Sequence, residues 1–205
     1  MNAPRLELFY DLSSPWTYIA FTNLAHVEQR TGITAHLRPV LVGGIFNAVN
    51  PSVYAARDSG DNPKFIHSFK VLKDWAALAG LAIKFPSQYH PAKSIAAMRM
   101  ACALESDQAA LRRFTKAAFE AYFLRAENLD DPAILIAAAN QAGLDGAKIA
   151  GDSVTTDIKA QLRANTDEAV KRGAYGSPSL FVDEKYMYFG NDQLPLVEAR
   201  LMGQI

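Results

Sequence analysis

The fold of this chain is decided by the segment DLSSPWT, residues 11–17, where one periodic pattern ends and another begins. The preceding run LELFY, residues 6–10, is too apolar for a solvated edge strand and predicts a buried one. Pro15 suits the first position of a helix, where its missing N–H costs nothing, and this makes Ser14 the natural N-cap. Apolar residues then recur at helical spacing until Gly32, a plausible stop. We therefore expect a strand, a tight turn and a helix that begins beside Ser14.

Ser14 would lie where a helix can attract an anion. The free N–H groups and the positive end of the helix favour negative charge at this position. The ordinary alternative is a capping serine with no further role, because serine is among the commonest N-caps.

The composition is that of a globular protein without a strong charge bias. With 205 residues, 50% hydrophobic and 20% charged, the chain can bury a sizeable core, and one domain with an insertion is expected. Lys plus Arg equals Asp plus Glu at 21 each, so neither nucleic acid nor a membrane surface is expected as a partner. A single cysteine, Cys102, excludes an intramolecular disulfide. Because we find no export segment and no long apolar run, we expect a cytoplasmic protein.

Beyond the first helix the pattern divides into successive parts. Residues 33–38 alternate and predict a second strand that closes a βαβ unit with parallel pairing. Residues 39–62 carry Gly-Gly, Asn-Pro and Ser-Gly-Asp-Asn-Pro, which is loop chemistry with a short helix inside it. Residues 63–173 are helical almost throughout. From residue 174 the period returns to two, which predicts a hairpin that turns at 183–185, followed by a closing helix.

This order resembles a thioredoxin fold, α/β in class, with a large all-helical domain inserted between the second and third strands. We expect residues 1–40 and 174–205 to form the thioredoxin-like domain, and residues 41–173 to form the connecting loop and the inserted helical domain. Thioredoxin-like redox proteins carry Cys-x-x-Cys where Ser14 and Thr17 stand here. A Cys-x-x-Cys works by thiolate attack and disulfide exchange, whereas two hydroxyls can only hydrogen-bond. The chain is therefore predicted to hold a thiolate that another molecule supplies.

Short motifs over nearly the whole chain carry a more specific resemblance. They are FYDLSSPW at residues 9–16, GIF at 44–46, Asn50-Pro51, Lys64 ahead of Trp75, Phe85-Pro86, Gly176-Ser177-Pro178 and FGND at 189–192. In this order and spacing they resemble the 2-hydroxychromene-2-carboxylate isomerase family, which is allied to kappa-class glutathione transferases and to DsbA-like proteins. The resemblance implies glutathione as the cofactor and a homodimer.

The resemblance assigns Ser14 as the hydrogen-bond donor to the glutathione sulfur. A charge-assisted bond is worth about 1.5 to 3 kcal/mol, and the helix end adds about 0.3 to 1 kcal/mol. At about 1.4 kcal/mol per pKa unit, these lower a thiol pKa from about 8.5 by roughly one to three units, which is enough to ionise it at neutral pH. Ser14 itself is a poor nucleophile, because the sequence places no histidine or lysine beside it to activate it.

The loop Ser177-Pro178 resembles the cis-proline loop of thioredoxin folds. Ser177 would offer its backbone to the cysteinyl unit of glutathione like an added strand, and Pro178 would be cis. An ordinary trans Ser-Pro turn is the alternative. Relatives mostly carry an apolar residue where Ser177 stands, but the backbone role survives this departure.

Other positions are implied to contact the ends of glutathione. Gly190, Asn191 and Asp192 would hold the γ-glutamyl end at a helix start, and the alternative is a plain Asn-Asp cap. Asn50 and Lys64 would reach the glycine and cysteinyl parts, although Lys64 alone would be read as a solvated lysine at a helix start. Relatives often carry arginine after this Asn-Asp pair, where this chain has glutamine, which puts one carboxylate contact in doubt.

The substrate pocket is less well marked. Tyr89 and Lys93 could bind a carboxylate or phenolate of the acceptor. The four histidines have no metal-ligand spacing, so no metal site is predicted. Cys102, between two alanines on an apolar helix face, is expected to be an inert buried thiol.

These observations lead to the hypothesis of a glutathione-dependent isomerase of aromatic catabolism. By the resemblance, the thiolate adds reversibly to a conjugated carbon of 2-hydroxychromene-2-carboxylate or of its open-chain isomer, hydroxybenzylidenepyruvate. Rotation and elimination then give the other isomer. One alternative is a kappa-like glutathione transferase that leaves the adduct intact. Another is a glutathione-binding thioredoxin-fold protein without turnover.

Overall fold

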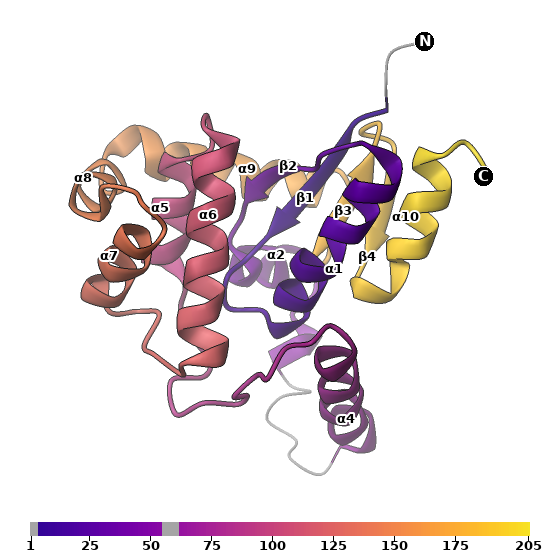
Figure 1. The fold of residues 1–205 in the computed structure, drawn as a ribbon, viewed down its shortest axis with the longest axis horizontal. Helices are drawn as coiled ribbons and strands as arrows, with labels where there is room; N and C mark the ends of the chain where they lie inside the picture. Colours follow the sequence, from indigo (N-terminus) through magenta and orange to yellow (C-terminus); the bar gives the residue numbers. More distant parts are fainter. Residues whose placement is uncertain (1–3, 55–61) are drawn as a thin grey trace.

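A computed structural model describes residues 4–54 and 62–205, which form a four-stranded mixed sheet surrounded by helices (Figure 1). The strand order is β2-β1-β3-β4. The two central strands are β1 (Leu6–Tyr10) and β3 (Ser179–Val182), and the edges are β2 (His36–Pro39) and β4 (Tyr186–Phe189). β1 pairs with β2 in parallel and with β3 antiparallel, and β3 and β4 form the expected hairpin.

Helices cover both faces of the sheet, and most of them belong to a long insertion between β2 and β3. The first helix is α1 (Pro15–Thr31), which ends at Gly32 with φ of 72° as expected, and the last is α10 (Leu194–Leu201), preceded by a 3-10 turn (Asn191–Gln193). Between β2 and β3 lie α2 (Val42–Val49), α4 (Pro63–Leu78), α5 (Ile95–Ala103), α6 (Gln108–Phe119) with a π-helical turn (Glu120–Leu124), α7 (Pro132–Gln141), α8 (Gly146–Asp152) and α9 (Thr156–Lys171). None of the described helices has the length and apolar character needed to cross a bilayer.

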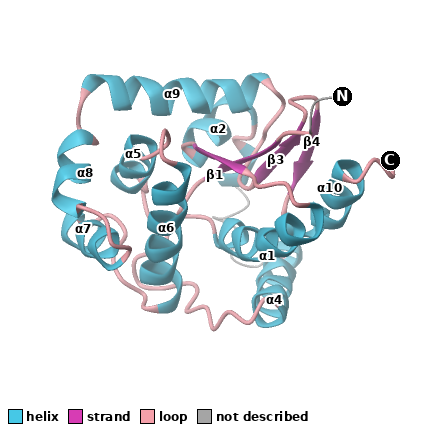
Figure 2. Cartoon of the chain, turned by 45° about the horizontal axis from the view of Figure 1, so that its top comes forward, coloured by secondary structure: helices cyan, strands magenta, loops and turns pink. Residues whose placement is uncertain are grey.

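The two faces of β1 are buried against different helices. Leu6, Leu8 and Tyr10 belong to the main core with α1, α10 and the inserted helices, whereas Phe9 packs with Ile45 of α2 and with α9. Figure 2 shows α9 running across one side of the molecule above α2, with α1 and α10 on the other side of the sheet. Burial on both faces explains why the run 6–10 is apolar.

The second strand differs from the sequence prediction. Alternation predicted a strand at residues 33–38, but β2 begins at His36 and ends at Pro39. Pairing with β1 starts with Glu7 opposite His36 and ends with Tyr10 opposite Pro39. Before His36 the ladder stops because the N–H and carbonyl of Ala35 bind the side chains of Glu28 and Arg112 instead. The short helix expected within residues 39–62 is α2, and residues 55–61 of that segment lie outside the described residues.

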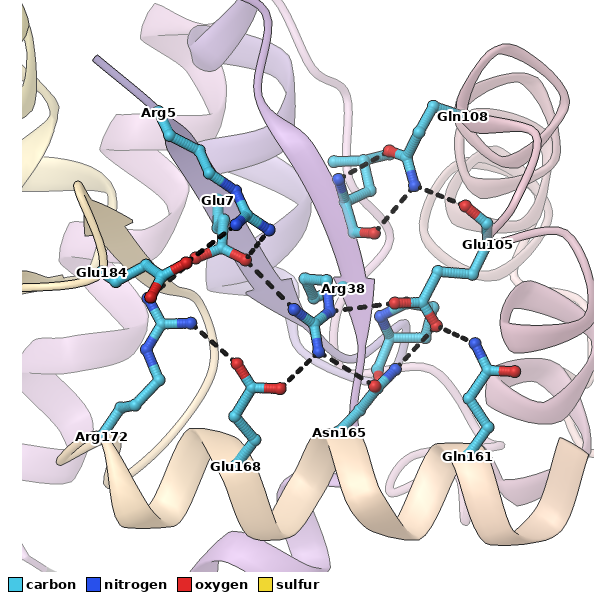
Figure 3. A network of polar contacts seen from close by, with 12 residues as sticks. Arg5, Glu7, Arg38, Glu105, Gln108, Gln161, Asn165, Glu168, Arg172 and Glu184 are labelled. Carbon is cyan, nitrogen blue, oxygen red and sulfur yellow. Dashed lines mark hydrogen bonds and ion pairs between the residues drawn. The ribbon is translucent and has the colours of Figure 1, made fainter. Parts of the chain in front are cut away.

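A buried charge network fastens α9 to the sheet (Figure 3). The carboxylate of Glu7 on β1 is only 1% exposed and receives Arg5, Arg38 and Arg172 at 2.9, 3.1 and 2.8 Å. Glu168 of α9 pairs with both Arg38 and Arg172, at 2.6 and 3.0 Å. Both of these arginines also lie over the ring of Phe9, so each makes a cation–π contact with β1 in addition to its ion pairs.

Candidate functional site

Ser14 caps α1 and faces the loop before β3. Its φ and ψ are −92° and 118°, and its Oγ accepts a hydrogen bond from Thr17 N at 3.2 Å, which satisfies one of the free N–H groups of the helix. The same hydroxyl donates to the carbonyl oxygen of Ser177 at 3.1 Å. The Ser177–Pro178 bond is cis, as expected. Ser14 therefore acts as the predicted cap and in addition contacts the cis-proline loop directly.

The hydroxyl of Ser177 makes contacts that the sequence analysis missed. Its Oγ accepts from the backbone N–H of Asp11 at 2.9 Å and lies 2.8 Å from Oγ1 of Thr17. Ser177 and Thr17 are 7% and 0% exposed. The residue that departs from the family pattern thus joins the end of β1, the first turn of α1 and the cis-proline loop. Its partner Thr17 occupies the second position of the Cys-x-x-Cys pattern.

A cavity of about 620 Å³ lies against this junction. Trp16 of α1 borders it, with Ser177, Pro178, Phe189, Gly190 and Asp192 among the residues around it. Its size is that of a pocket for a small molecule. The backbone on one side is held in place because Gly190 N donates to Pro178 O at 3.2 Å.

The turn at residues 190–192 has one side chain at the cavity and another buried in the interior. Gly190 has φ of +99°, a conformation that strains any residue with a side chain, and a Cβ there would lie 2.7 Å from Oδ1 of Asp192, so that side chain would have to move. Asp192 borders the cavity, and its Oδ2 accepts from Gln193 Nε2 at 3.1 Å. Asn191 is 2% exposed, and its Oδ1 accepts from Asn23 of α1 at 2.8 Å. The structure therefore places Asp192 at the cavity and Asn191 behind it.

The remaining predicted cofactor residues lie further out. Asn50 ends α2, and its Nδ2 donates to the carbonyl oxygen of Tyr175, a residue that borders the cavity, at 3.2 Å. Lys64 is exposed in the first turn of α4, where its backbone N–H is bound by the cap Asn62. Asn50 is thus at the edge of the cavity, and Lys64 is not among the residues that border it.

Tyr89 and Lys93 belong to the loop between α4 and α5 rather than to the cavity wall. Tyr89 is 38% exposed, and the backbone N–H of Lys93 donates to Asp130 at 2.9 Å. Tyr122 anchors this loop from below, because its hydroxyl accepts from Ala92 N at 3.2 Å and lies 3.4 Å from the carbonyl oxygen of Tyr89. Phe85 packs against the same apolar cluster as Trp16. An apolar wall therefore continues from the cavity toward the predicted substrate loop.

A buried carboxylate, Asp11, lies at the base of the site and was not predicted to have a role. Its Oδ1 accepts from the N–H and the hydroxyl of Ser13 at 2.9 and 2.8 Å. Its Oδ2 accepts from Val42 N, at the start of α2, at 2.8 Å and from Ser94 Oγ, at the start of α5, at 3.1 Å. Burial raises the pKa of Asp11, although these four donors oppose the shift. The position of an aspartate at the end of a buried strand was the only sequence signal of this junction.

Comparison with known proteins agrees with this architecture. The family profile described as "DSBA-like thioredoxin domain" matches residues 5–202. The chain belongs to the DsbA-like thioredoxin family. The fold predicted from the sequence, a thioredoxin fold with a helical insertion, is thereby confirmed.

Relatives with two different names match almost the full length. "Glutathione S-transferase kappa 1" from Rattus norvegicus is 31% identical and aligns over 98% of this chain and 92% of the rat protein. "2-hydroxychromene-2-carboxylate isomerase" from Sphingobium xenophagum is 23% identical over 96% of this chain and 97% of its own. Among solved structures, a 2-hydroxychromene-2-carboxylate isomerase superposes with a TM-score of 0.75 at 22% identity, covering 97% of this chain and 94% of the other. The predicted resemblance to this group of proteins is confirmed.

Proposed function

We propose that this protein binds glutathione and uses its thiolate to isomerise an intermediate of aromatic catabolism, of the type 2-hydroxychromene-2-carboxylate to hydroxybenzylidenepyruvate. The observation that carries the proposal is the Ser14 hydroxyl, which caps α1 and donates to the carbonyl oxygen of Ser177, a residue that borders a cavity of about 620 Å³. The relatives named for the isomerase and for kappa-class transferases support the same proposal. A solved structure of "cytosolic disulfide reductase DsbM" with GSH, at a TM-score of 0.67, has the same fold.

Each part of glutathione has a suitable partner around the cavity. The cysteinyl unit would align with the backbone of Ser177, next to cis-Pro178. The ammonium of the γ-glutamyl end would pair with the exposed carboxylate of Asp192. Asn50, which binds the carbonyl oxygen of Tyr175, would take the glycine end, and Lys64 would have to reach across from α4.

The hydrogen of the Ser14 hydroxyl changes partner in this proposal. It now points to the carbonyl oxygen of Ser177. The carbonyl oxygen has two lone pairs and could accept the cysteinyl N–H of glutathione in either case. The hydroxyl would turn to the sulfur because a hydrogen bond to a thiolate is stronger than one to a neutral carbonyl. The charge-assisted bond of about 1.5 to 3 kcal/mol then lowers the thiol pKa by roughly one to two units.

The reaction follows from a bound thiolate that can also leave. When bound, glutathione would supply a thiolate that adds reversibly to a conjugated carbon of the open-chain keto acid and leaves again, so that it is not consumed. The chromene is a cyclic hemiketal, so its ring carbon–oxygen bond would first break, with the hydroxyl proton passing to the phenolate oxygen, to give that keto acid. The addition would make the former double bond single, so that it could rotate before the thiolate leaves. Ser14 would hold the thiolate by a hydrogen bond before the addition and after the elimination. The apolar wall from Trp16 to Phe85 suits an aromatic substrate.

A second candidate is a kappa-like glutathione transferase, which the 31% identity to the rat protein favours. The two functions are separated by following substrate isomerisation and free glutathione together. The isomerase proposal predicts turnover with constant glutathione. Stoichiometric loss of glutathione to an electrophile without isomerised product would establish the transferase instead. Binding without either reaction would leave a glutathione-binding protein.

The role of Ser14 is tested with Ser14→Ala and with the exposed Ser106→Ala as a matched control. Ser14→Ala should raise the pKa of the bound thiol by roughly one to two units, measured from thiolate absorbance against pH, and should reduce turnover accordingly. Ser106→Ala should match the wild type. If Ser14→Ala left both the thiol pKa and the turnover unchanged, Ser14 would not be the thiolate donor.

A further inference from the structure

A second cavity, of about 590 Å³, lies between α2 and α9. Gly44 and Ala48 line it from one face of α2. Asn50, on the opposite face, donates to the carbonyl oxygen of Tyr175 at the first cavity. The two cavities share none of their bordering residues. Figure 2 shows the two helices that form most of this second cavity, α2 and α9, lying one above the other.

The floor of this cavity is apolar. Leu41, Leu162 and Val170 contribute side chains, and the small residues of α2 leave the space open. Thr166 also lines the floor. Its hydroxyl is already hydrogen-bonded, because it accepts from Leu41 N at 3.0 Å and donates to Leu162 O at 2.8 Å, so it adds no unpaired polar group to the apolar floor. Its methyl group lies 3.0 Å from where a Cβ on Gly44 would be, so the helices α2 and α9 touch at this point.

The rim carries an excess of positive charge. Arg99, Lys159, Arg163 and Lys171 face a single carboxylate, Asp167, which leaves three positive charges in excess on a chain whose formal net charge is zero. Arg163 and Asp167 are 3.9 Å apart and 85% and 74% exposed, so their ion pair is weak. In the described part of the chain, Arg99, Lys159 and Lys171 have no ion pair or side-chain hydrogen bond. Arg99 is half-buried at the rim of the cavity.

We infer that this second cavity binds a small amphipathic organic anion, a carboxylate or sulfonate on an apolar body. The apolar floor covers the body, and the planar fork of Arg99 suits a carboxylate, with Lys159 and Lys171 adding charge around it. The volume is within the usual range for a small ligand, about 300 to 1,000 Å³. A polyphosphate would fit less well, because it would place polar oxygens on Leu162 and Val170.

The test is calorimetric titration of the full chain with dodecanoate and with dodecanol, which share the apolar body and differ in charge. Dodecanoate should bind at least tenfold more tightly than dodecanol, and only its binding should weaken with added salt. Arg99→Gln should weaken dodecanoate binding at least about tenfold and leave dodecanol unchanged, since a hydrogen bond to a charged group is worth about 1.5 to 3 kcal/mol and about 1.4 kcal/mol is tenfold in affinity. Lys73→Gln, on the exposed surface of α4, is the matched control and should bind like the wild type.

A second variant tests the place of binding. Ala48 is exposed, so Ala48→Phe fills the cavity without disturbing the core, and it should abolish binding of both ligands while the thermal unfolding stays unchanged. The inference is overturned if Arg99→Gln and Ala48→Phe both leave dodecanoate affinity within twofold of the wild type. It is also overturned if glutathione displaces dodecanoate competitively, which would place the ligand at the Ser14 site. The alternative occupant of this cavity is a second copy of the chain, and light scattering tests it. If Arg99→Gln lowered the mass of a dimer and left dodecanoate affinity unchanged, the cavity would be an interface between two copies.

Discussion

Replacing Ser177 by alanine should destabilise the protein by about 2 to 6 kcal/mol. The substitution removes the acceptor of Asp11 N–H at 2.9 Å and the partner of Thr17 Oγ1 at 2.8 Å, and both of these groups are fully buried. A buried polar group without a partner costs about 1 to 3 kcal/mol, and there are two such groups. Urea unfolding followed by tryptophan fluorescence measures the change in the free energy of unfolding, with Ser106→Ala as the exposed control.

A double-mutant cycle with Thr17→Val isolates the part of this destabilisation that comes from the contact between the Ser177 and Thr17 side chains. Because the valine no longer needs a partner, the double variant should be about 1 kcal/mol more stable than the sum of the single changes predicts. Glutathione affinity should change by less than about threefold in Ser177→Ala, since the backbone carbonyl that would bind the cysteinyl unit remains. A cost below about 0.5 kcal/mol, or single changes that simply add, would refute the reasoning.

Three further predictions concern acid stability, thiol reactivity and the turn at Gly190. Burial raises the pKa of Glu168, but its ion pairs with Arg38 and Arg172 outweigh this and lower it below the ordinary value. Glu168 therefore contributes stability that is present above about pH 4.3 and is lost as the pH falls through the folded-state pKa. Glu168→Gln should flatten that part of the pH dependence in urea unfolding, and an unchanged slope would contradict it. Burial and the nearby Glu105 raise the pKa of the Cys102 thiol to about 12. The native protein should therefore resist alkylation by iodoacetamide at pH 8 and react only when it is unfolded. Rapid labelling of the native protein would disprove this. Gly190→Ala should destabilise the protein by more than about 1 kcal/mol, because φ is +99° and the new Cβ would lie 2.7 Å from the Asp192 carboxylate. Urea unfolding and glutathione titration measure the effect. If both matched the wild type, the turn would accommodate the side chain without strain.

The sequence was informative where a contact depends on neighbours in the chain. The cap at Ser14, the stop at Gly32 and the hairpin after Ser179 are local arrangements, and the structure confirms all three. The start of β2 was predicted three residues too early, because alternation at 33–35 is the same whether or not a partner strand reaches that far.

Contacts between distant segments could not be predicted in the same way. Ser177 meets Thr17 across 160 residues of sequence, and Asp11 meets Ser94 across 83. Neither pair leaves a periodic pattern, since each contact joins two single polar side chains from separate parts of the chain. The substrate loop shows the same limit: Tyr89 was recognised by its place in a motif, whereas the buried Tyr122 that anchors the loop looked like one more apolar position on a helix.

The hydroxyl pair at Ser14 and Thr17 has a consequence for durability under oxidative stress. Cysteine thiolates in redox sites can be oxidised stepwise to sulfinic and sulfonic acids, which are largely irreversible losses, whereas serine and threonine hydroxyls do not enter that sequence of reactions. The buried Cys102, whose pKa is raised, forms little thiolate for peroxides to attack. In the proposed function, the reactive thiolate therefore belongs to a diffusible tripeptide, and exchange with fresh glutathione would replace an oxidised thiol without repair of a catalytic cysteine in the protein.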